Sequence, residues 1–188
     1  GTTVMSGNGV NITTTGGDIG ASPDQLQFNQ QQRTGDFDLQ VRVNGLTLGD
    51  DWSRAGLMAR ESLDAGARFA AVFATPSING CLFQYRANAG QSATTAGTHP
   101  VNYPDTWLRL RRVGNLFVGY ASFDGQVWTP LGLATLNLPA TLYFGYAVTS
   151  HSGTNATTAQ FRDLGNTINT GVGRFATRNE PVGPSNRR

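Results

Sequence analysis

Arg, Gln and Tyr side chains recur at alternate positions in segments of this sequence that read as β-strands. Arg and Gln hydrogen-bond hydroxyl groups, Arg can grip a carboxylate with two parallel hydrogen bonds, and an aromatic ring can stack on the apolar face of a sugar. Five such side chains lie on the polar side of their segments: Arg60, Gln84, Arg86, Arg109 and Tyr120. We expect them to converge on one outer, concave surface that binds a glycan. The alternative is a solvated sheet face, on which each Arg stem covers apolar surface and each head pairs with an acid.

Carboxylates suited to glycoside hydrolysis are scarce in this sequence. That reaction usually needs two carboxyl groups flanking the scissile bond. The chain has two Glu, Glu61 and Glu180, and the second lies in a polar tail. Acids at alternate positions occur at Asp36 and Asp38, but at a strand start, where capping or cation binding is the simpler interpretation. The sequence therefore predicts a protein that is not an enzyme, with a glycosidase or lyase as an alternative.

The sequence gives little indication of a metal site or of a catalytic nucleophile. Two His and one Cys argue against zinc, and Cys81 lies in an alternating apolar run that indicates a small buried thiol. Ser150 and His151 are adjacent, which does not make them a nucleophile–base pair. No cofactor is expected, although a structural calcium ion would suit carboxylate oxygens. The candidate calcium ligands, which form no loop motif, are Asp18, Asp36, Asp38 and Asp163.

Period-two alternation bounded by Gly, Asn and Asp predicts the elements that must position these side chains. Gly114-Asn115 and Asp124-Gly125 suit tight hairpin turns. Ten short strands and no helical periodicity favour an all-β fold made of two antiparallel sheets. The predicted strands are 26–31, 37–46, 54–61, 69–75, 81–87, 107–113, 116–123, 127–132, 142–150 and 157–164.

Two stretches read as loops, and one tryptophan lies in a third. Residues 88–105 are rich in Gly, Thr and Asn and form a long predicted loop, of a kind that is often functional. Residues 16–24 are similar but shorter. Trp52 follows two aspartates; it either plugs the edge of the sandwich, which we favour, or stacks on a ligand.

Charge is low and unevenly distributed. All 14 basic residues are Arg; residues 1–165 carry 10 Arg and 11 acids, whereas residues 166–188 carry four Arg and one Glu. A near-neutral body argues against nucleic-acid binding, which needs a basic face. No apolar run approaches the roughly 20 residues needed to span a bilayer. We therefore expect neither a nucleic-acid partner nor a transmembrane segment.

Several motifs carry a resemblance to a known superfamily. They are Trp52-Ser53-Arg54-Ala55-Gly56-Leu57-Met58-Ala59-Arg60-Glu61, Phe83-Gln84-Tyr85-Arg86, Trp107-Leu108-Arg109-Leu110-Arg111-Arg112, Tyr120-Ala121-Ser122-Phe123-Asp124-Gly125 and Gly145-Tyr146-Ala147-Val148. In this order they resemble the concanavalin A-like lectin/glucanase superfamily, and within it the bacterial group labelled DUF1349, or laminin G-like domains. The resemblance implies a jelly-roll sandwich with a curved sheet, often appended to extracellular enzymes and suspected of binding carbohydrate.

These observations predict a β-sandwich domain over residues 1–165 and a polar, basic C-terminal tail or linker over 166–188. The function they favour is a non-catalytic, lectin-like module of an exported bacterial protein, extracellular or periplasmic, whose partner is a glycan or polysaccharide. The alternative is a structural or accessory subunit of a larger exported or membrane-associated assembly, docked through its surface and tail. In that case the tail arginines would bind the protein partner: Arg174, Arg178, Arg187 and Arg188.

Overall fold

Alternating apolar residues separated by glycine-marked turns produce the strands of this protein. The computed structural model describes residues 1–167, and the tail arginines predicted to bind a partner lie outside them. The strands within that range are β1 (Thr2–Ser6), β2 (Gly9–Thr14), β3 (Gln27–Thr34), β4 (Phe37–Leu46), β5 (Arg54–Arg60), β6 (Phe69–Ala74), β7 (Cys81–Arg86), β8 (Thr94–His99), β9 (Thr106–Val113), β10 (Leu116–Ser122), β11 (Thr129–Thr135), β12 (Thr141–Thr149) and β13 (Thr157–Asn166). No helix in residues 1–167 is long and apolar enough to cross a membrane.

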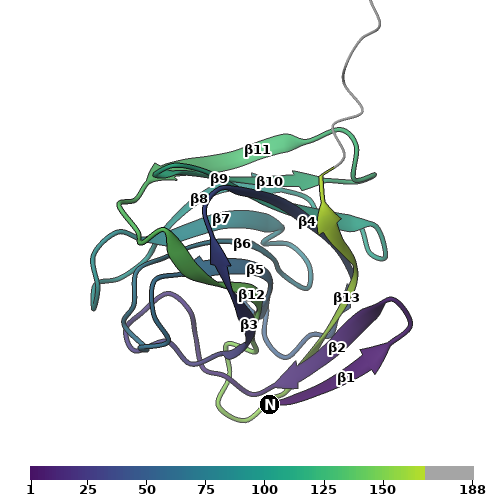
Figure 1. Cartoon of the computed structure of the whole chain (residues 1–188). Coiled ribbons are helices and arrows are strands. Elements are labelled where there is room, and N and C mark those ends of the chain that lie inside the picture. The colour runs from purple at the N-terminus through teal and green to yellow at the C-terminus, as the bar shows by residue number, and fades with distance from the viewer. Residues whose placement is uncertain (168–188) are drawn as a thin grey trace, which may run out of the picture.

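The strands form two antiparallel sheets packed face to face, as Figure 1 shows with β9, β10 and β11 above β5, β6 and β7. The seven-stranded sheet has the order β1-β2-β13-β4-β9-β10-β11, and the six-stranded sheet has the order β3-β12-β5-β6-β7-β8. The chain crosses between sheets repeatedly, so strands distant in sequence become neighbours. The predicted two-sheet jelly-roll sandwich is confirmed.

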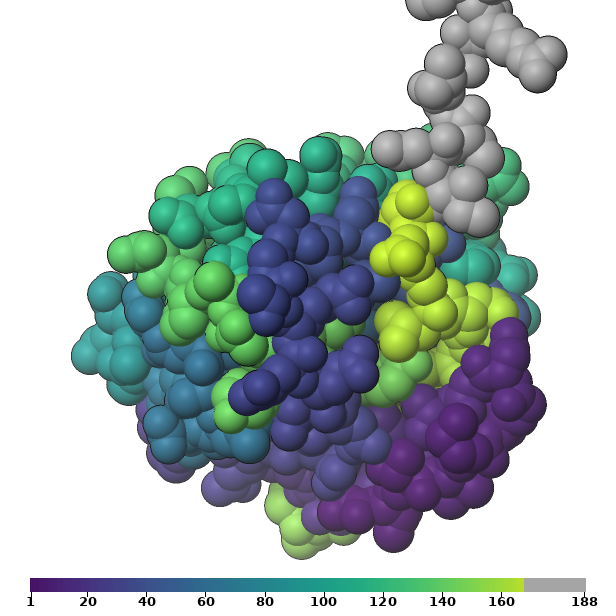
Figure 2. Space-filling view, viewed as in Figure 1, coloured from purple at the N-terminus to yellow at the C-terminus, as the bar shows by residue number. Residues whose placement is uncertain are grey.

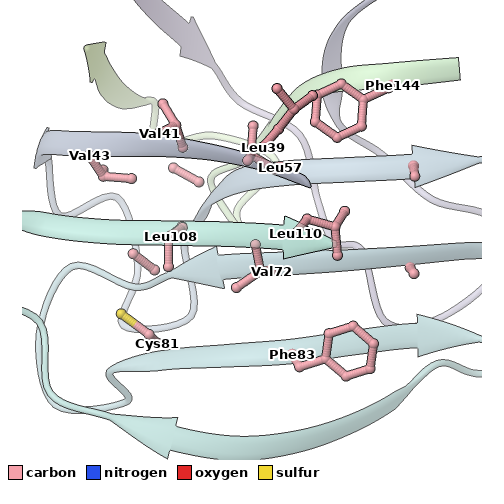
Figure 3. Close-up of a cluster of buried hydrophobic side chains, with 14 of the residues drawn as sticks. Leu39, Val41, Val43, Leu57, Val72, Cys81, Phe83, Leu108, Leu110 and Phe144 are labelled. Carbon is pink, nitrogen blue, oxygen red and sulfur yellow. The ribbon is translucent and has the colours of Figure 1, made fainter. Parts of the chain in front are cut away.

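The inward-facing residues of both sheets form one core. Leu39, Val41 and Val43 of β4 face Leu57 of β5 and Val72 of β6 across the interior (Figure 3). Each of these side chains comes from the apolar side of an alternating strand, which is why period-two patterning predicts the inner face correctly.

The only cysteine of the chain belongs to this core. Cys81 is fully buried beside β6, and burial raises the pKa of its thiol to about 12. The predicted role as a small, unreactive buried residue is consistent with this environment.

Three strands were not predicted from the sequence. β1 and β2 form an N-terminal hairpin that pairs with β13, and in Figure 2 its purple surface lies beside the yellow end of that strand. β8 lies inside the predicted loop 88–105, where it pairs with β7. Four of its six residues are exposed, so it carries little apolar alternation and is held by backbone hydrogen bonds instead.

The outer face of the six-stranded sheet is covered over its central strands, β5, β6 and β7. Residues 15–26, which we call the covering segment, connect β2 to β3 and run across this face. Ile19 of the segment is fully buried against Met58, Phe69, Phe73 and other outward-facing residues, and these form a second apolar cluster. Most of this loop was predicted, but its position over a sheet was not.

Candidate functional site

The prediction of one exposed polar surface is wrong for the residues of the six-stranded sheet. Arg60, Gln84 and Arg86 do share the outer face of β5 and β7, but they are 2%, 2% and 0% exposed. The covering segment and the loops around residues 62–67 and 88–93 lie over them. The alternation identifies the face correctly, whereas the segment that buries it comes from elsewhere in the chain.

Arg86 and Arg60 are held by a buried carboxylate of the covering segment. Asp24 accepts two hydrogen bonds from Arg86, at 2.8 and 2.7 Å, and lies 3.1 Å from Nη2 of Arg60. The carboxylate is inaccessible, and so is the Arg86 side chain. Arg86 also donates to the carbonyl oxygens of Ala21 and Gln91, which completes its hydrogen bonding. Arg86 therefore holds the fold together and is not open to a ligand.

Arg109 and Tyr120 lie on the other sheet, on the outer face of β9 and β10, so the five predicted residues do not converge. Arg109 binds both carboxylate oxygens of Asp38, at 2.6 and 2.5 Å. Its guanidinium carbon also lies 4.8 Å from the ring centre of Tyr120 and 5.6 Å from that of Trp128. The hydrogen bonds to Asp38 raise the pKa of Arg109.

A second tryptophan on this face is covered in the same way. Arg42 lies 5.8 Å from the ring centre of Trp107 and forms an ion pair with Asp163 at 2.8 Å. Gly125 packs against the same indole, because a Cβ there would lie 2.9 Å from the ring. These aromatic rings contact guanidinium groups, and the face resembles the solvated, ion-paired alternative more closely than an open stacking platform.

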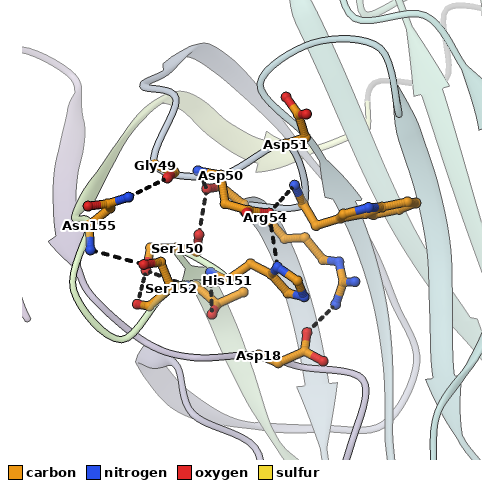
Figure 4. Close-up of polar contacts among 12 residues, drawn as sticks. Asp18, Gly49, Asp50, Asp51, Arg54, Ser150, His151, Ser152 and Asn155 are labelled. Carbon is orange, nitrogen blue, oxygen red and sulfur yellow. Dashed lines mark hydrogen bonds and ion pairs between the residues drawn. The ribbon is translucent and has the colours of Figure 1, made fainter.

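A different group of polar residues gathers where loops meet at one end of the six-stranded sheet (Figure 4). We call it the loop-end site and define it by Asp18, Asp50, Trp52, Arg54 and His151. Oδ1 of Asp50 accepts from the backbone N–H of Trp52 at 2.8 Å and lies 2.9 Å from Nδ1 of His151. Oδ1 of Asp18 lies 2.9 Å from Nη1 of Arg54. Three loops thus present two carboxylates, an imidazole and an indole together.

Trp52 is 42% exposed, so the favoured prediction that it plugs the sandwich edge is wrong. The guanidinium carbon of Arg54 lies 5.8 Å from the centre of its ring. An indole held in this way keeps exposed apolar surface for a ligand.

The electrostatics of the loop-end site follow from burial and hydrogen bonding. Burial lowers the pKa of Arg54, and Asp18 opposes that change. The Nε–H of Arg54 is buried and finds no hydrogen-bond partner in the described chain. The backbone amide of Trp52, and His151 after it, lower the pKa of Asp50. The site therefore holds charged groups with unmet hydrogen-bonding capacity.

Hydrogen bonds from side chains to the backbone connect the loops to one another. Ser53 Oγ donates to the carbonyl oxygen of Ser150 at 2.8 Å, and Asn79 donates to that of Asp51 at 2.8 Å. His151 adopts a left-handed conformation with φ of 56°, which is uncommon for a residue other than glycine and recurs at functional sites. Such preorganisation reduces the entropy lost when a ligand binds.

The side-chain hydroxyl of Ser150 does not point to the imidazole. Its Oγ donates to the carbonyl oxygen of Ser152 at 2.7 Å and also lies 3.1 Å from that of Gly16. This agrees with the prediction that Ser150 and His151 are not a nucleophile–base pair.

The predicted calcium ligands are dispersed. Asp18, Asp38 and Asp163 each pair with an arginine, and Asp36 accepts the backbone N–H of Gly114 at 2.7 Å. Among residues 1–167, no three metal-ligating side chains of His, Cys, Asp or Glu lie together.

Sequence reasoning named Asp18 and Trp52 but did not assign Asp50, Arg54 or His151 to a site. The available signal was their position: Arg54 and His151 lie at predicted strand ends and Asp50 in the loop before Arg54, and the ends of neighbouring strands meet in a sandwich. Which ends meet depends on the order β12-β5-β6 in the sheet, and the sequence pattern does not specify that order.

Comparison with solved structures supports the fold. A functionally unknown protein from Saccharomyces cerevisiae aligns with a TM-score of 0.70 and 19% identity, over 87% of this chain and 90% of that one. A legume lectin-like domain from Entamoeba histolytica aligns with a TM-score of 0.59 and 13% identity, over 87% and 85% of the two chains. These likenesses show a lectin-like jelly-roll fold, which is consistent with the resemblance of the sequence motifs.

Similarity also extends to part of a larger glycosidase-family protein. The GH43 protein BlXynB from Bacillus licheniformis aligns with a TM-score of 0.59 and 15% identity, over 82% of this chain but 32% of that protein. No family model and no curated protein matches the chain, so membership of the DUF1349 group stays a prediction.

Proposed function

We propose that this chain is a non-catalytic, lectin-like module that binds carbohydrate through the loop-end site. The observation that carries the proposal is the exposed Trp52 ring, fixed beside Arg54, Asp50 and His151. Sugars present hydroxyl groups and apolar C–H faces on one ring, and this site offers partners for both. The lectin-like fold supports the same conclusion, because a solved structure of similar fold, the exoplasmic domain of VIP36, has Man3GlcNAc bound.

The absence of catalysis is part of the proposal. Hydrolysis needs an acid and a second carboxylate facing the bond between them. At the loop-end site, Asp18 is paired with Arg54 and Asp50 contacts His151, so each carboxylate already has a side-chain partner. We further propose that the module belongs to an exported bacterial protein, as the resemblance to appended extracellular domains implies.

The test is affinity electrophoresis through gels that contain soluble polysaccharides, neutral and acidic. We expect at least one polysaccharide to retard the wild type. Trp52→Ala should weaken that binding at least about tenfold, equivalent to roughly 1.4 kcal/mol, because the exposed stacking surface is lost. Trp128→Ala is the matched control and should bind normally, since its ring is less exposed than that of Trp52 and lies on the other sheet, beside Arg109. No retardation by any polysaccharide, or equal loss in both variants, would contradict the proposal.

A further inference from the structure

A pocket lies at the end of the covering segment that is farther from the loop-end site, beside the ion pairs that Asp24 forms with Arg60 and Arg86. We call it the Arg60 pocket. It is about 350 Å³ in volume and is lined by β3, by the start of the loop after β5 and by Arg60. Its apolar walls come from Leu26, Phe28, Leu63 and Ala65, and its polar lining comes from Asp24, Gln27, Gln30 and Arg60. A volume of this size accommodates a small ligand.

The floor of this pocket carries an excess of positive charge. Arg60 and Arg86, 2% and 0% exposed, share one buried carboxylate, that of Asp24. Two guanidinium groups and one carboxylate leave one positive charge without a buried partner. Two further acids act on Arg60 from nearby: the charge of Asp64 raises the pKa of Arg60, and Arg60 lowers the pKa of Glu61. Neither is a buried partner, because Asp64 is exposed and accepts a hydrogen bond from Ser62, and Glu61 is bound by Arg68. Burying a charge without a counter-charge is costly, so an anion in the pocket would be stabilised.

Arg60 has hydrogen-bonding capacity left for such an anion. Its Nε donates to the carbonyl oxygen of Ser62 at 3.0 Å, and its Nη2 donates to the carbonyl oxygen of Asp64 and pairs with Asp24. Its Nη1 has a thioether partner, Met58 Sδ at 3.8 Å, which is a weak acceptor. Burial, and the adjacent Arg86, also lower the pKa of Arg60, and a bound anion would oppose both effects.

The lining selects a particular kind of anion. Asp24 also faces the pocket, but its two oxygens already accept from Arg86 and pair with Arg60. The exposed amide of Gln30 is available at the mouth, and Phe28, Leu26 and Leu63 offer an apolar wall. One carboxylate next to an apolar ring face matches this arrangement. We propose that the Arg60 pocket binds the carboxylate of a uronic acid, which makes the module selective for acidic polysaccharides; this specificity rests on the proposed carbohydrate-binding function.

The first test introduces a carboxylate into the pocket by substitution, so the experiment does not require the ligand to be known. Gln30→Glu places a negative charge at the mouth of the pocket, on the outer face of β3. Gln31→Glu is the matched control, because it makes the same change at the next residue, equally exposed, on the opposite face of the strand. We expect Gln30→Glu to raise the melting temperature by about 2–4 °C over the control at pH 7. Equal melting temperatures would contradict an unmet positive charge.

Ligand selectivity provides the second test. Calorimetric titration would compare trigalacturonate and trimannuronate with their methyl esters, which lack the charge. We expect the wild type to bind at least one acid about tenfold more tightly than its ester. Gln30→Glu and Arg60→Gln should abolish that preference, whereas Gln31→Glu should keep it. Arg60→Gln leaves Asp24 bound to Arg86, and a thermal melt would confirm that this variant folds.

The outcomes separate the two proposals. Equal affinity for acid and ester, lost on Trp52→Ala, would overturn the uronate pocket and leave carbohydrate binding standing. Binding of neutral polysaccharides alone would do the same. A failure of every saccharide to bind would overturn both proposals.

Discussion

The outer faces of the two sheets read alike in sequence and differ in structure. Both alternate Arg, Gln and aromatic residues with apolar ones. On the six-stranded sheet, the covering segment buries these residues, and Asp24 pairs with two guanidinium groups away from water. On the seven-stranded sheet the face stays partly open, and Arg42 and Arg109 cover its aromatic rings. Period-two patterning therefore identifies a face but not what lies over it, and both proposed ligand sites lie where the cover ends.

The largest expected difference between the faces concerns their carboxylates. Asp24→Asn removes the buried counter-charge of Arg60 and Arg86, and should lower the free energy of unfolding by about 3–5 kcal/mol. Asp38→Asn removes the partner of Arg109 on the open face, where the Asp38 side chain is 30% exposed, and should cost about 1 kcal/mol or less. Urea denaturation at pH 7 measures both. Similar losses in the two variants would mean that the covering segment does not isolate its ion group from water.

Apolar contacts should separate the faces nearly as clearly. Ile19→Ala empties the centre of the second apolar cluster and should destabilise the protein by about 2–5 kcal/mol. Leu133 of β11 lies on the open sheet and is 64% exposed, so Leu133→Ala should change stability by no more than about 0.5 kcal/mol. Thermal and urea unfolding of both variants gives the comparison. A mild effect of Ile19→Ala would show that the segment packs loosely on the sheet.

The smallest effect concerns the pH dependence of an ion pair beside the covered face. The side chain of Arg68 hydrogen-bonds Glu61 and lowers its pKa. Because the folded-state pKa lies below the unfolded value, this pair stabilises the protein at neutral pH, and its contribution is lost as pH falls through the folded-state pKa. Glu61→Gln should therefore cost up to about 1 kcal/mol at pH 7 and almost nothing near pH 2. A pH-independent difference from wild type would assign the effect to packing rather than charge.

Much of the fold follows from local patterns in the sequence. The inner faces of β5, β7 and β9 were correctly assigned from alternation, and Gly114-Asn115 does form the tight turn between β9 and β10, with Gly114 at φ of 57°. β8 and β1 were missed because their residues are mostly polar or exposed, and pairing with neighbouring strands holds them in place. β2 was missed although its alternating Val10 and Ile12 lie in the core.

The candidate sites were harder to predict, because they depend on contacts between distant segments. Asp18 and Arg54 are 36 positions apart, and Asp50 and His151 are 101 apart. Arg60 was predicted to bind a glycan on an open surface. We now propose that it binds the carboxylate of a uronic acid in a pocket. No local signal shows that Asp24 lies between Arg60 and Arg86, since this depends on the path of the covering segment across the sheet.

The most direct test of ligand binding at the loop ends uses the indole N–H signals of the three tryptophans. Trp52 belongs to the loop-end site, whereas Trp107 and Trp128 lie on the face of the seven-stranded sheet. Nuclear magnetic resonance spectra would be recorded during titration with whichever oligosaccharide the electrophoresis identifies. We predict that the Trp52 indole signal shifts with saturation while those of Trp107 and Trp128 stay in place. Shifts confined to Trp107 and Trp128, with Trp52 unmoved, would contradict the account.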